Sequence, residues 1–360
     1  MDLQVQEMIS QQILVPNPFS TGFLSTIFLV QRPDGSSRPI INLKRLNQFL
    51  SPRKFHLLNH FKVPDFLQKN DFLVKIDLSQ AYFHVPIKTS HQRFLSVSYR
   101  SQLFCMTCLP FGLATAPQIF AKLSNWVAGY LRKQGIRVIV YLDDFLLANQ
   151  DPSLLQSQTD FTLEKLRFLG WSVNVNKSEL TPVQALQYLG IVWNPSTDLK
   201  YLPLEKQNVI GGHLTKVAHS GKWSWKTAMV TMGFLSFASF VVPLGKLHYR
   251  HVQRQSRRLP RNHPLKLHQI PSLALSQLRW WISALYLPYS HPQSFLVLRK
   301  RLYDRCVRER MGSNGVDNRM VKGSRTNQQK EWHINVKELI AVQMSLDSNL
   351  DYLQNKVVLI

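Results

Sequence analysis

The stretch that decides the fold is KIDLSQAYF (Lys75–Phe83), together with YLDD (Tyr141–Asp144) farther along the chain. In each segment an aspartate follows a run of apolar residues, which is typical of a strand that ends with an acidic side chain at the edge of a sheet. A two-metal site for phosphoryl transfer needs clustered oxygen ligands, because Mg²⁺ is a hard cation. The candidate ligands of two Mg²⁺ ions, with Mn²⁺ as a substitute, are the carboxylates of Asp77, Asp143 and Asp144 and the carbonyl of Leu78.

The residues around these acids predict a sheet with helices beside it. The apolar run Phe72–Ile76 predicts a strand, and the apolar runs on either side of Leu142-Asp143-Asp144 predict a hairpin with the acids at its tip. An Asp-Asp pair alone usually marks only a turn, so the Pro-Phe-Gly loop within Leu109–Pro117 adds necessary support. Further elements are expected over Gly22–Leu50 (strand, turn, strand and helix), Arg93–Met106 (two strands), Gln118–Arg132 (helix), Pro152–Leu169 (helix), Trp171–Val175 (strand) and Tyr188–Trp193 (strand).

The chain is strongly basic. Its 360 residues include 44 Lys and Arg against 21 Asp and Glu, a formal net charge of +23 that favours a polyanionic partner such as nucleic acid. Between Lys206 and Tyr303, fifteen Lys and Arg occur without any Asp or Glu. The alternative to nucleic-acid contact by this basic segment is a core helix whose basic face is solvated. Rings in this segment that are available for packing or for stacking on bases are Trp223, Trp225, Tyr249, Trp280 and Trp281.

Cysteine content and hydropathy predict an intracellular protein. Cys105, Cys108 and Cys306 give no disulfide framework and fit a reducing compartment. The N-terminus lacks the pattern of a signal peptide. The uncharged segment Thr227–Gly245 contains hydroxyl side chains and a proline, which favours a buried helix over a membrane span. We therefore expect a location in the cytoplasm or nucleus and no membrane partner.

The length predicts more than one compact core. The segment Asn194–Thr197 is polar and contains a proline, so it is the expected boundary after the acidic motifs. The predicted division is 1–194, then a basic helical region over 195–291, and then a shorter unit over 292–360.

The motifs resemble those of a known family. YLDD (Tyr141–Asp144) resembles the Tyr-x-Asp-Asp box of reverse transcriptases, Asp77–Phe83 resembles their first catalytic motif, and Leu109–Pro117 resembles their nucleotide-pocket loop. The resemblance extends in the correct order over Val15–Trp193. It implies an α+β right-hand polymerase with fingers, palm and a thumb or connection. It also implies an RNA-directed DNA polymerase, a nucleotidyltransferase of a retrotransposon that uses an RNA or DNA template, a primer and deoxynucleoside triphosphates.

The resemblance also implies roles for single residues. Tyr82 would be the steric gate that rejects a 2′-hydroxyl, with a packed core tyrosine as the alternative. Lys177 would protonate pyrophosphate, with a solvated loop lysine as the alternative. Some families carry Gln at the position of Phe111, so no side-chain hydrogen bond is expected there. The implied catalytic residues are Asp77, Asp143 and Asp144, the other nucleotide-binding residues are Arg32, Arg38, Gln80, Ala81, Phe111 and Gly112, and the implied primer grip is Leu189 and Gly190.

The C-terminal segment resembles part of a ribonuclease H domain. Trp332–Val342 is similar to the helix that carries its glutamate in DIRS-type retroelements, which assigns that role to Glu338, and Gly233–Arg250 is similar to the connection of the same group. A working site needs about four carboxylates around its metals, and the other expected motifs are absent. We therefore expect a partial ribonuclease H-like unit without ribonuclease H activity.

The segment Leu302–Asn314 stands where the first acidic motif of such a domain is expected. Permitted codons for it, read one nucleotide out of phase, can spell Tyr-Thr-Thr-Asp-Ala-Ser-Glu-Ser-Gly-Trp-Gly-Ala-Met, which is that motif. Our hypothesis is a pair of compensating frame errors, and it fails if the coding DNA shows no out-of-phase Asp-Ala-Ser. Asp304 is accordingly not a catalytic candidate.

Two alternatives to a reverse transcriptase follow from the same residues. A relic that binds nucleic acid but no longer catalyses would explain the incomplete C-terminal unit, whereas the intact acids and Tyr82 oppose it. A template-directed RNA polymerase shares the metal chemistry but is not expected to have an aromatic gate. The oligomeric state stays open.

Overall fold

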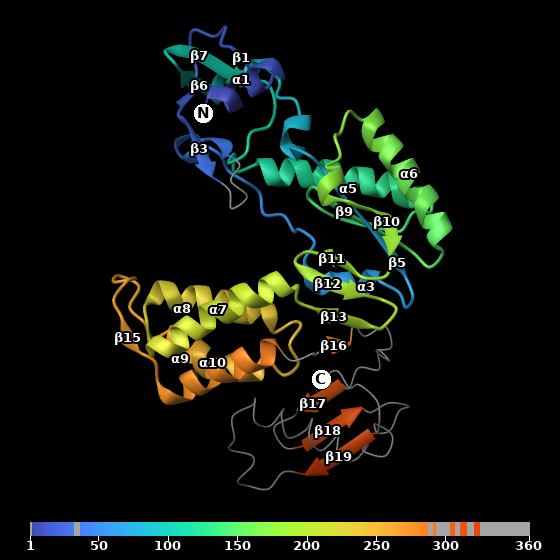
Figure 1. Cartoon of the computed structure of the whole chain (residues 1–360), viewed down its shortest axis with the longest axis vertical. Helices are drawn as coiled ribbons and strands as arrows, with labels where there is room; N and C mark the ends of the chain where they lie inside the picture. The colour runs from blue at the N-terminus through green and yellow to red at the C-terminus, as the bar shows by residue number, and fades with distance from the viewer. Residues whose placement is uncertain are drawn as a thin grey trace. The chain divides into compact units, whose positions relative to one another are not determined.

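The computed structural model describes residues 2–31, 37–286, 291–292, 303–306, 310–314 and 320–324. The chain divides into two compact units, Met1–Gln293 and Ser294–Ile360 (Figure 1). In the second unit the described residues form an antiparallel sheet of β17 (Tyr303–Cys306), β18 (Arg310–Asn314) and β19 (Met320–Ser324). The predicted ribonuclease H residue Glu338 lies outside the described residues.

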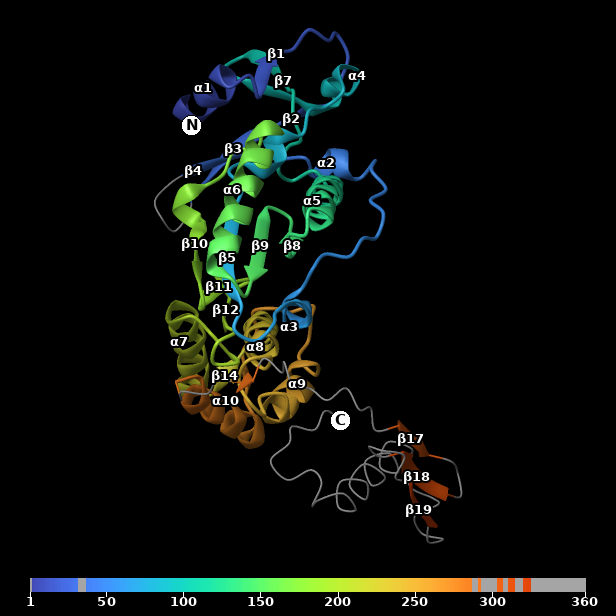
Figure 2. The same ribbon diagram turned by 90° about the vertical axis from the view of Figure 1, so that its right-hand side faces the viewer.

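A central sheet in the first unit has the strand order β10-β5-β9-β8. The strands are β5 (Phe72–Asp77), β8 (Val138–Tyr141), β9 (Asp144–Asn149) and β10 (Glu179–Val183). Strands β5 and β9 run antiparallel, side by side (Figure 2), and their register pairs Asp77 with Asp144. The predicted hairpin that ends on the acids is therefore present.

Two helices, α5 (Ala116–Lys133) and α6 (Pro152–Phe168), share one hydrophobic core with this sheet. Alternate residues of a strand face the same side, so Val74 and Ile76 of β5 point together toward Phe120 of α5 and Leu155 of α6, and all four are fully buried. Asp151 caps α6 by accepting hydrogen bonds from the backbone N–H groups of residues 153 and 154, at 2.8 and 3.2 Å.

A second core lies under the N-terminal sheet, whose order is β1-β7-β6-β2. Its strands are β1 (Leu14–Pro16), β2 (Leu24–Ser25), β6 (Ser96–Tyr99) and β7 (Gln102–Met106), and it is accompanied by the hairpin β3 (Ile27–Gln31)–β4 (Ser37–Ile41), by α1 (Asp2–Ser10) and by α2 (Lys44–Asn47). Val5 and Met8 attach α1 to this core. The short helices of the connections are η1 (His60–Lys62), α3 (Val63–Phe66), η2 (Ala81–His84), α4 (Thr89–Gln92), η3 (Arg93–Leu95), η4 (Val175–Lys177) and η5 (Leu247–Tyr249).

A third sheet and a group of helices complete the first unit. The sheet, in the order β11-β12-β13-β16, consists of β11 (Leu186–Tyr188), β12 (Ile191–Asn194), β13 (Leu199–Tyr201) and β16 (His291–Pro292). The helices are α7 (Leu204–Ser220), α8 (Trp225–Ala238), α9 (Arg250–Ser256) and α10 (Ser272–Leu285), with the short pair β14 (Lys222–Trp223) and β15 (His268–Gln269). None of the helices that can be described is long and apolar enough to cross a membrane.

Two predicted strands were wrong. Over Trp171–Val175 the only strand pairing is a single antiparallel bridge between Val173 and Leu78. Its two bonds join the N–H of Asn174 to the carbonyl of Asp77 and the N–H of Ser79 to the carbonyl of Ser172. Tyr188–Trp193 is not one strand but parts of two, joined by the turn Leu189-Gly190. Both turn residues have positive φ, 51° and 75°, which is the backbone of a tight two-residue hairpin. Strand β10 was not predicted.

Lys200 on β13 is an unusual core residue and gives a stability prediction. Its side chain is 4% exposed, and Nζ lies 4.1 Å from the centre of the Phe240 ring. Burial and, secondarily, the charge of Lys246 lower the pKa of Lys200 to about 8, against the opposing charge of Asp198. Keeping the ammonium charged in the folded state therefore costs roughly 3 kcal/mol below pH 8.

We expect Lys200→Met to raise the free energy of unfolding at pH 7 by about 2–3 kcal/mol. Because the unfolded state binds more protons between pH 8 and 10.5, the stability of the unsubstituted chain rises over that interval and the advantage of the variant fades. Urea unfolding of both chains at pH 7 and pH 10 measures this difference. A variant less stable than the unsubstituted chain at pH 7 would show that the ammonium is not penalised by burial.

Candidate active site

The three predicted acids meet where the central hairpin turns. Asp77 ends β5, Asp144 begins β9 opposite to it, and Asp143 lies in the connecting turn. Leu142 takes a positive φ of 53° in this turn. The backbone N–H of Leu78 donates to the carbonyl of Asp143 at 3.1 Å, which joins the end of β5 to the turn. Residues far apart in the sequence are thereby fixed as neighbours through backbone bonds.

The site holds concentrated negative charge. Burial is the main cause that raises the pKa of Asp144 to about 7, followed by the charges of Asp143 and Asp77, while Lys75 acts in the opposite direction. The carboxyl of Asp144 is also within hydrogen-bonding reach of Asp77. A half-buried group of like charges is stabilised by any cation that enters it.

A loop after α6 holds the end of β5 in place. The N–H of Asp77 donates to Oγ of Ser178 at 3.0 Å, and the carbonyl of Asp77 accepts from the N–H of Asn174 at 2.8 Å. Oγ of Ser178 in turn donates to the carbonyl of Asn174 at 2.7 Å. This closed set of bonds places Lys177, in the short helix η4, at the rim of the site.

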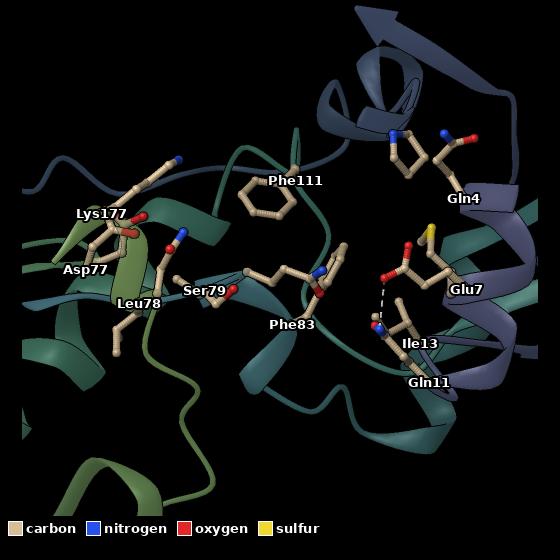
Figure 3. Close-up of a pocket in the computed structure, with 16 residues that line it drawn as sticks. Gln4, Glu7, Gln11, Ile13, Asp77, Leu78, Ser79, Phe83, Phe111 and Lys177 are labelled. Carbon is tan, nitrogen blue, oxygen red and sulfur yellow. Dashed lines mark hydrogen bonds between the residues drawn. The ribbon is translucent and has the colours of Figure 1, made fainter. Parts of the chain in front are cut away.

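A cavity of about 390 Å³ opens from the acids (Figure 3). Asp77, Leu78, Asp143 and Lys177 line it, and Phe111 and Phe83 lie farther along. The opposite wall in Figure 3 is formed by Gln4, Glu7 and Met8 of α1 and by Gln11, which directly follows this helix. The remaining lining residues are Ile13, Pro39, Ser79, Gln80, Ala81 and Asn174. The contribution of α1 was not predicted, because this segment carries no motif.

Of the residues implied to bind the nucleotide, Gln80, Ala81, Phe111 and Lys177 line this cavity, whereas Tyr82 and Gly112 lie outside its lining. Gln80 takes a left-handed φ of 50° before η2. The Tyr82 ring packs against Phe111 at 4.8 Å and Phe120 at 5.5 Å between ring centres, so it belongs partly to the core. Gly112 has a φ of 95°, and its carbonyl accepts from Nδ2 of Asn47 at 2.9 Å.

The remaining predicted site residues differ in how far they can be placed. Arg38 lies in β4 opposite Val30, whereas Arg32 is outside the described residues. Leu189 and Gly190 form the turn between β11 and β12, and Nζ of Lys206 donates to the carbonyl of Gly190 at 3.4 Å. A Cβ at residue 190 would meet this amine, which is the movable end of a side chain, so the positive φ is the reason that glycine is favoured there.

The donor atoms at the acids fit Mg²⁺ by their chemistry. Carboxylates and a carbonyl are the hard oxygen ligands that Mg²⁺ prefers. Burial first, and then the charges of Asp143 and Asp77, raise the pKa of Asp144, and a bound cation would stabilise its charged form. Within the described ranges, no three His, Cys, Asp or Glu side chains already stand so as to enclose a metal ion. The carboxylates would have to turn toward a common point when an ion binds.

The structure shows which rings of the basic helical region pack in the core. Trp223 and Trp281 are fully buried and Tyr249 is nearly so, because they fill the core between the helices. They are therefore not free to stack on bases. Trp280 stacks face to face on His248, with ring centres 3.7 Å apart. The basic side chains on and after α9 are exposed, namely Arg250, Arg254, Arg257, Arg258, Arg261 and Lys266.

Comparison with known proteins identifies relatives of part of the chain. Residues 30–193 match the family model described as reverse transcriptase (RNA-dependent DNA polymerase). Protein P of Duck hepatitis B virus (isolate Shanghai/DHBVQCA34) is 26% identical over 176 residues, which are 48% of this chain and 21% of that protein. The Transposon Tf2-3 polyprotein of Schizosaccharomyces pombe is 23% identical over 164 residues, 46% of this chain and 12% of that protein. The chain thus matches about a fifth or less of the length of these relatives.

Solved structures share the fold over nearly the whole chain. The foamy viral protease-reverse transcriptase dRH in complex with double-stranded DNA superposes with a TM-score of 0.70 and 16% identity, covering 97% of this chain and 60% of that one. The foamy viral protease-reverse transcriptase in complex with an RNA/DNA hybrid gives a TM-score of 0.66 and 16% identity, covering 96% and 45%. The fold is therefore the mixed α+β fold of these proteins, as predicted. The ribonuclease H unit and the DIRS type remain predictions.

Proposed function

We propose that the chain is an RNA-directed DNA polymerase of a retrotransposon, because residues 30–193 match the reverse transcriptase family model and are similar to hepadnaviral protein P and to a transposon polyprotein. The observation that carries the proposal is the register pair Asp77–Asp144 with Asp143 in the adjoining turn, at one end of a cavity that also presents Lys177. Acids and a cation that line the same cavity suit a nucleoside triphosphate.

The proposed reaction is attack of a primer 3′-hydroxyl on the α-phosphorus of a deoxynucleoside triphosphate, with pyrophosphate leaving. Asp77, Asp143, Asp144 and the Leu78 carbonyl would hold two Mg²⁺ ions, which when bound supply charge neutralisation at the attacking and leaving oxygens. The N–H groups of Gln80 and Ala81 orient the triphosphate, and Lys177 donates a proton toward the pyrophosphate. Phe111 and Gly112 form the floor under the sugar.

Tyr82 gives a direct prediction of sugar selectivity. Its ring is held by Phe111 and Phe120, so a 2′-hydroxyl would meet a fixed wall. Tyr82→Val is expected to weaken discrimination against ribonucleotides by roughly 10- to 100-fold. The matched control, Tyr82→Phe, keeps the ring and is expected to keep the discrimination. Single-nucleotide incorporation of dTTP and UTP gives the ratio, and an unchanged ratio in Tyr82→Val would remove the gate role.

The choice of nucleotide also tests the proposed function itself. The purified chain is expected to extend oligo(dT) on poly(rA) with dTTP and not with UTP. Extension with UTP alone would indicate an RNA polymerase. Absence of extension with both, while the template-primer still binds, would indicate the nucleic-acid-binding relic.

The finer assignment to DIRS-type retroelements is part of the same proposal. It is supported by the similarity of Trp332–Val342 and Gly233–Arg250 to that group, together with the division 1–194, 195–291 and 292–360. The absence of the first acidic motif at Leu302–Asn314 supports a ribonuclease H unit without activity. The coding sequence across Leu302–Asn314 tests the frame errors that we infer there.

A further inference from the structure

Tyr188 lies between the catalytic hairpin β8–β9 and the hairpin β11–β12. It is the last residue of β11, directly before the turn Leu189-Gly190, and it is 1% exposed. Its hydroxyl donates to the backbone carbonyl of Asp144 at 3.2 Å and also hydrogen-bonds the backbone of Tyr141. Tyr141 and Asp144 are the register pair that closes the catalytic hairpin. A single buried phenol thus contacts both strands of this hairpin at its turn.

The surroundings hold this phenol in one place. Tyr188 pairs with Ile191 across the turn, and its carbonyl accepts from Nε1 of the fully buried Trp193 at 3.0 Å. On the other side of the same turn, Nζ of Lys206 reaches the Gly190 carbonyl at 3.4 Å and lies 4.1 Å from the centre of the Phe237 ring on α8. The turn is therefore fixed by a helix on one side and by the catalytic hairpin on the other.

We propose that the Tyr188 hydroxyl is a positioning group that sets the Leu189-Gly190 turn against the catalytic hairpin and so fixes the backbone of Asp144. The inference rests on the proposed function, in which that turn holds the primer end and Asp144 binds metal. The hydroxyl touches neither substrate nor metal. It acts through the carbonyl of Asp144, and a displacement of the reacting groups by a fraction of an ångström lowers the rate of the chemical step.

Tyr188→Phe is the test, because it removes the hydroxyl and keeps the ring that fills the core. The variant leaves the Asp144 carbonyl without this donor in a buried position. We expect kcat for dTTP on poly(rA)/oligo(dT) to fall about tenfold, with KM for dTTP and the affinity for template-primer changed less than about twofold. Tyr201→Phe is the matched control, since it removes a hydroxyl from an exposed position of the same sheet and is expected to change nothing.

Hydrogen exchange supplies a readout that does not depend on activity. Amides of residues 141–145 are expected to exchange faster in Tyr188→Phe, while those of α5 and α10 keep their rates. Equal exchange in both variants, or a kcat equal to that of Tyr201→Phe, would overturn the inference. If the unsubstituted chain does not extend a primer, the proposed function fails and the exchange of residues 141–145 still decides whether Tyr188 fixes the hairpin.

Discussion

Asp144→Asn is expected to stabilise the folded chain and to reduce primer extension by at least roughly 10²–10³-fold. Asp144 is a half-buried carboxylate beside Asp77 and Asp143, and its pKa is raised to about 7. The folded state therefore disfavours the charged form of Asp144. As pH rises from the usual carboxyl pKa to about 7, the unfolded chain loses this proton before the folded chain does, so the free energy of unfolding falls over this interval and the full loss is reached above pH 7. Asparagine has nearly the same shape without the charge, so the expected gain is roughly 1–3 kcal/mol at pH 8.

The two effects of this substitution have opposite signs, which separates them from a general loss of structure. Thermal unfolding without divalent ions measures the first, and extension of a primer in Mg²⁺ measures the second. Asp160→Asn, at an exposed position of α6, is the matched control and is expected to change neither. A destabilised Asp144→Asn variant, or one with full activity, would mean that the acids do not form a charged metal site.

Asp71→Ala is expected to lower the free energy of unfolding by about 3–5 kcal/mol. Asp71 is fully buried and forms a two-point ion pair with Arg137, at 2.7 and 2.9 Å. It also accepts from the N–H of Gln68 at 2.7 Å, and Arg137 donates to the Phe66 carbonyl at 2.8 Å. The pair joins the segments that lead into β5 and β8, so its loss leaves an unpaired guanidinium among groups that are already ordered.

Urea unfolding measures this loss, which is a large fraction of the stability of a typical domain. The exposed pair Lys62–Asp65, at 3.3 Å, provides the control, and Asp65→Ala is expected to change stability by less than about 1 kcal/mol. The double variant Asp71→Ala with Arg137→Met should recover part of the loss, because no buried charge is then left alone. Equal effects of Asp71→Ala and Asp65→Ala would contradict a structural role for the buried pair.

The sequence predicted the catalytic hairpin because its signals are local. An apolar run, two acids and a second apolar run specify both the strands and the turn, and Asp77 follows a run of the same kind. The sequence pattern alone predicted one strand over Tyr188–Trp193, because these residues are apolar and a single glycine was the only sign of a break. Only the resemblance to the primer grip singled out Leu189 and Gly190. Trp171–Val175 has the composition of a strand, but it belongs to the loop that holds Asp77 in place, in which the N–H of Asn174 donates to the Asp77 carbonyl.

Features that depend on packing between distant segments were beyond the sequence. The sequence left open whether the rings of the basic region pack or stack on bases, because composition does not show which face of a helix is turned inward. In the structure Trp223 and Trp281 fill the core. Similarly, α1 reaches the cavity only because Val5 and Met8 attach it to the N-terminal core. The Tyr188 hydroxyl bond joins residues 44 positions apart and has no sequence signal of its own.

The most direct test of the central claim is Mg²⁺-dependent extension of oligo(dT) on poly(rA) by the purified chain and by Asp143→Asn, with template-primer binding measured on the same preparations. The proposal predicts extension by the unsubstituted chain, its loss in Asp143→Asn, and equal binding by both. Salt-dependent binding by both chains without extension by either would contradict it and would identify a protein that holds nucleic acid but does not copy it.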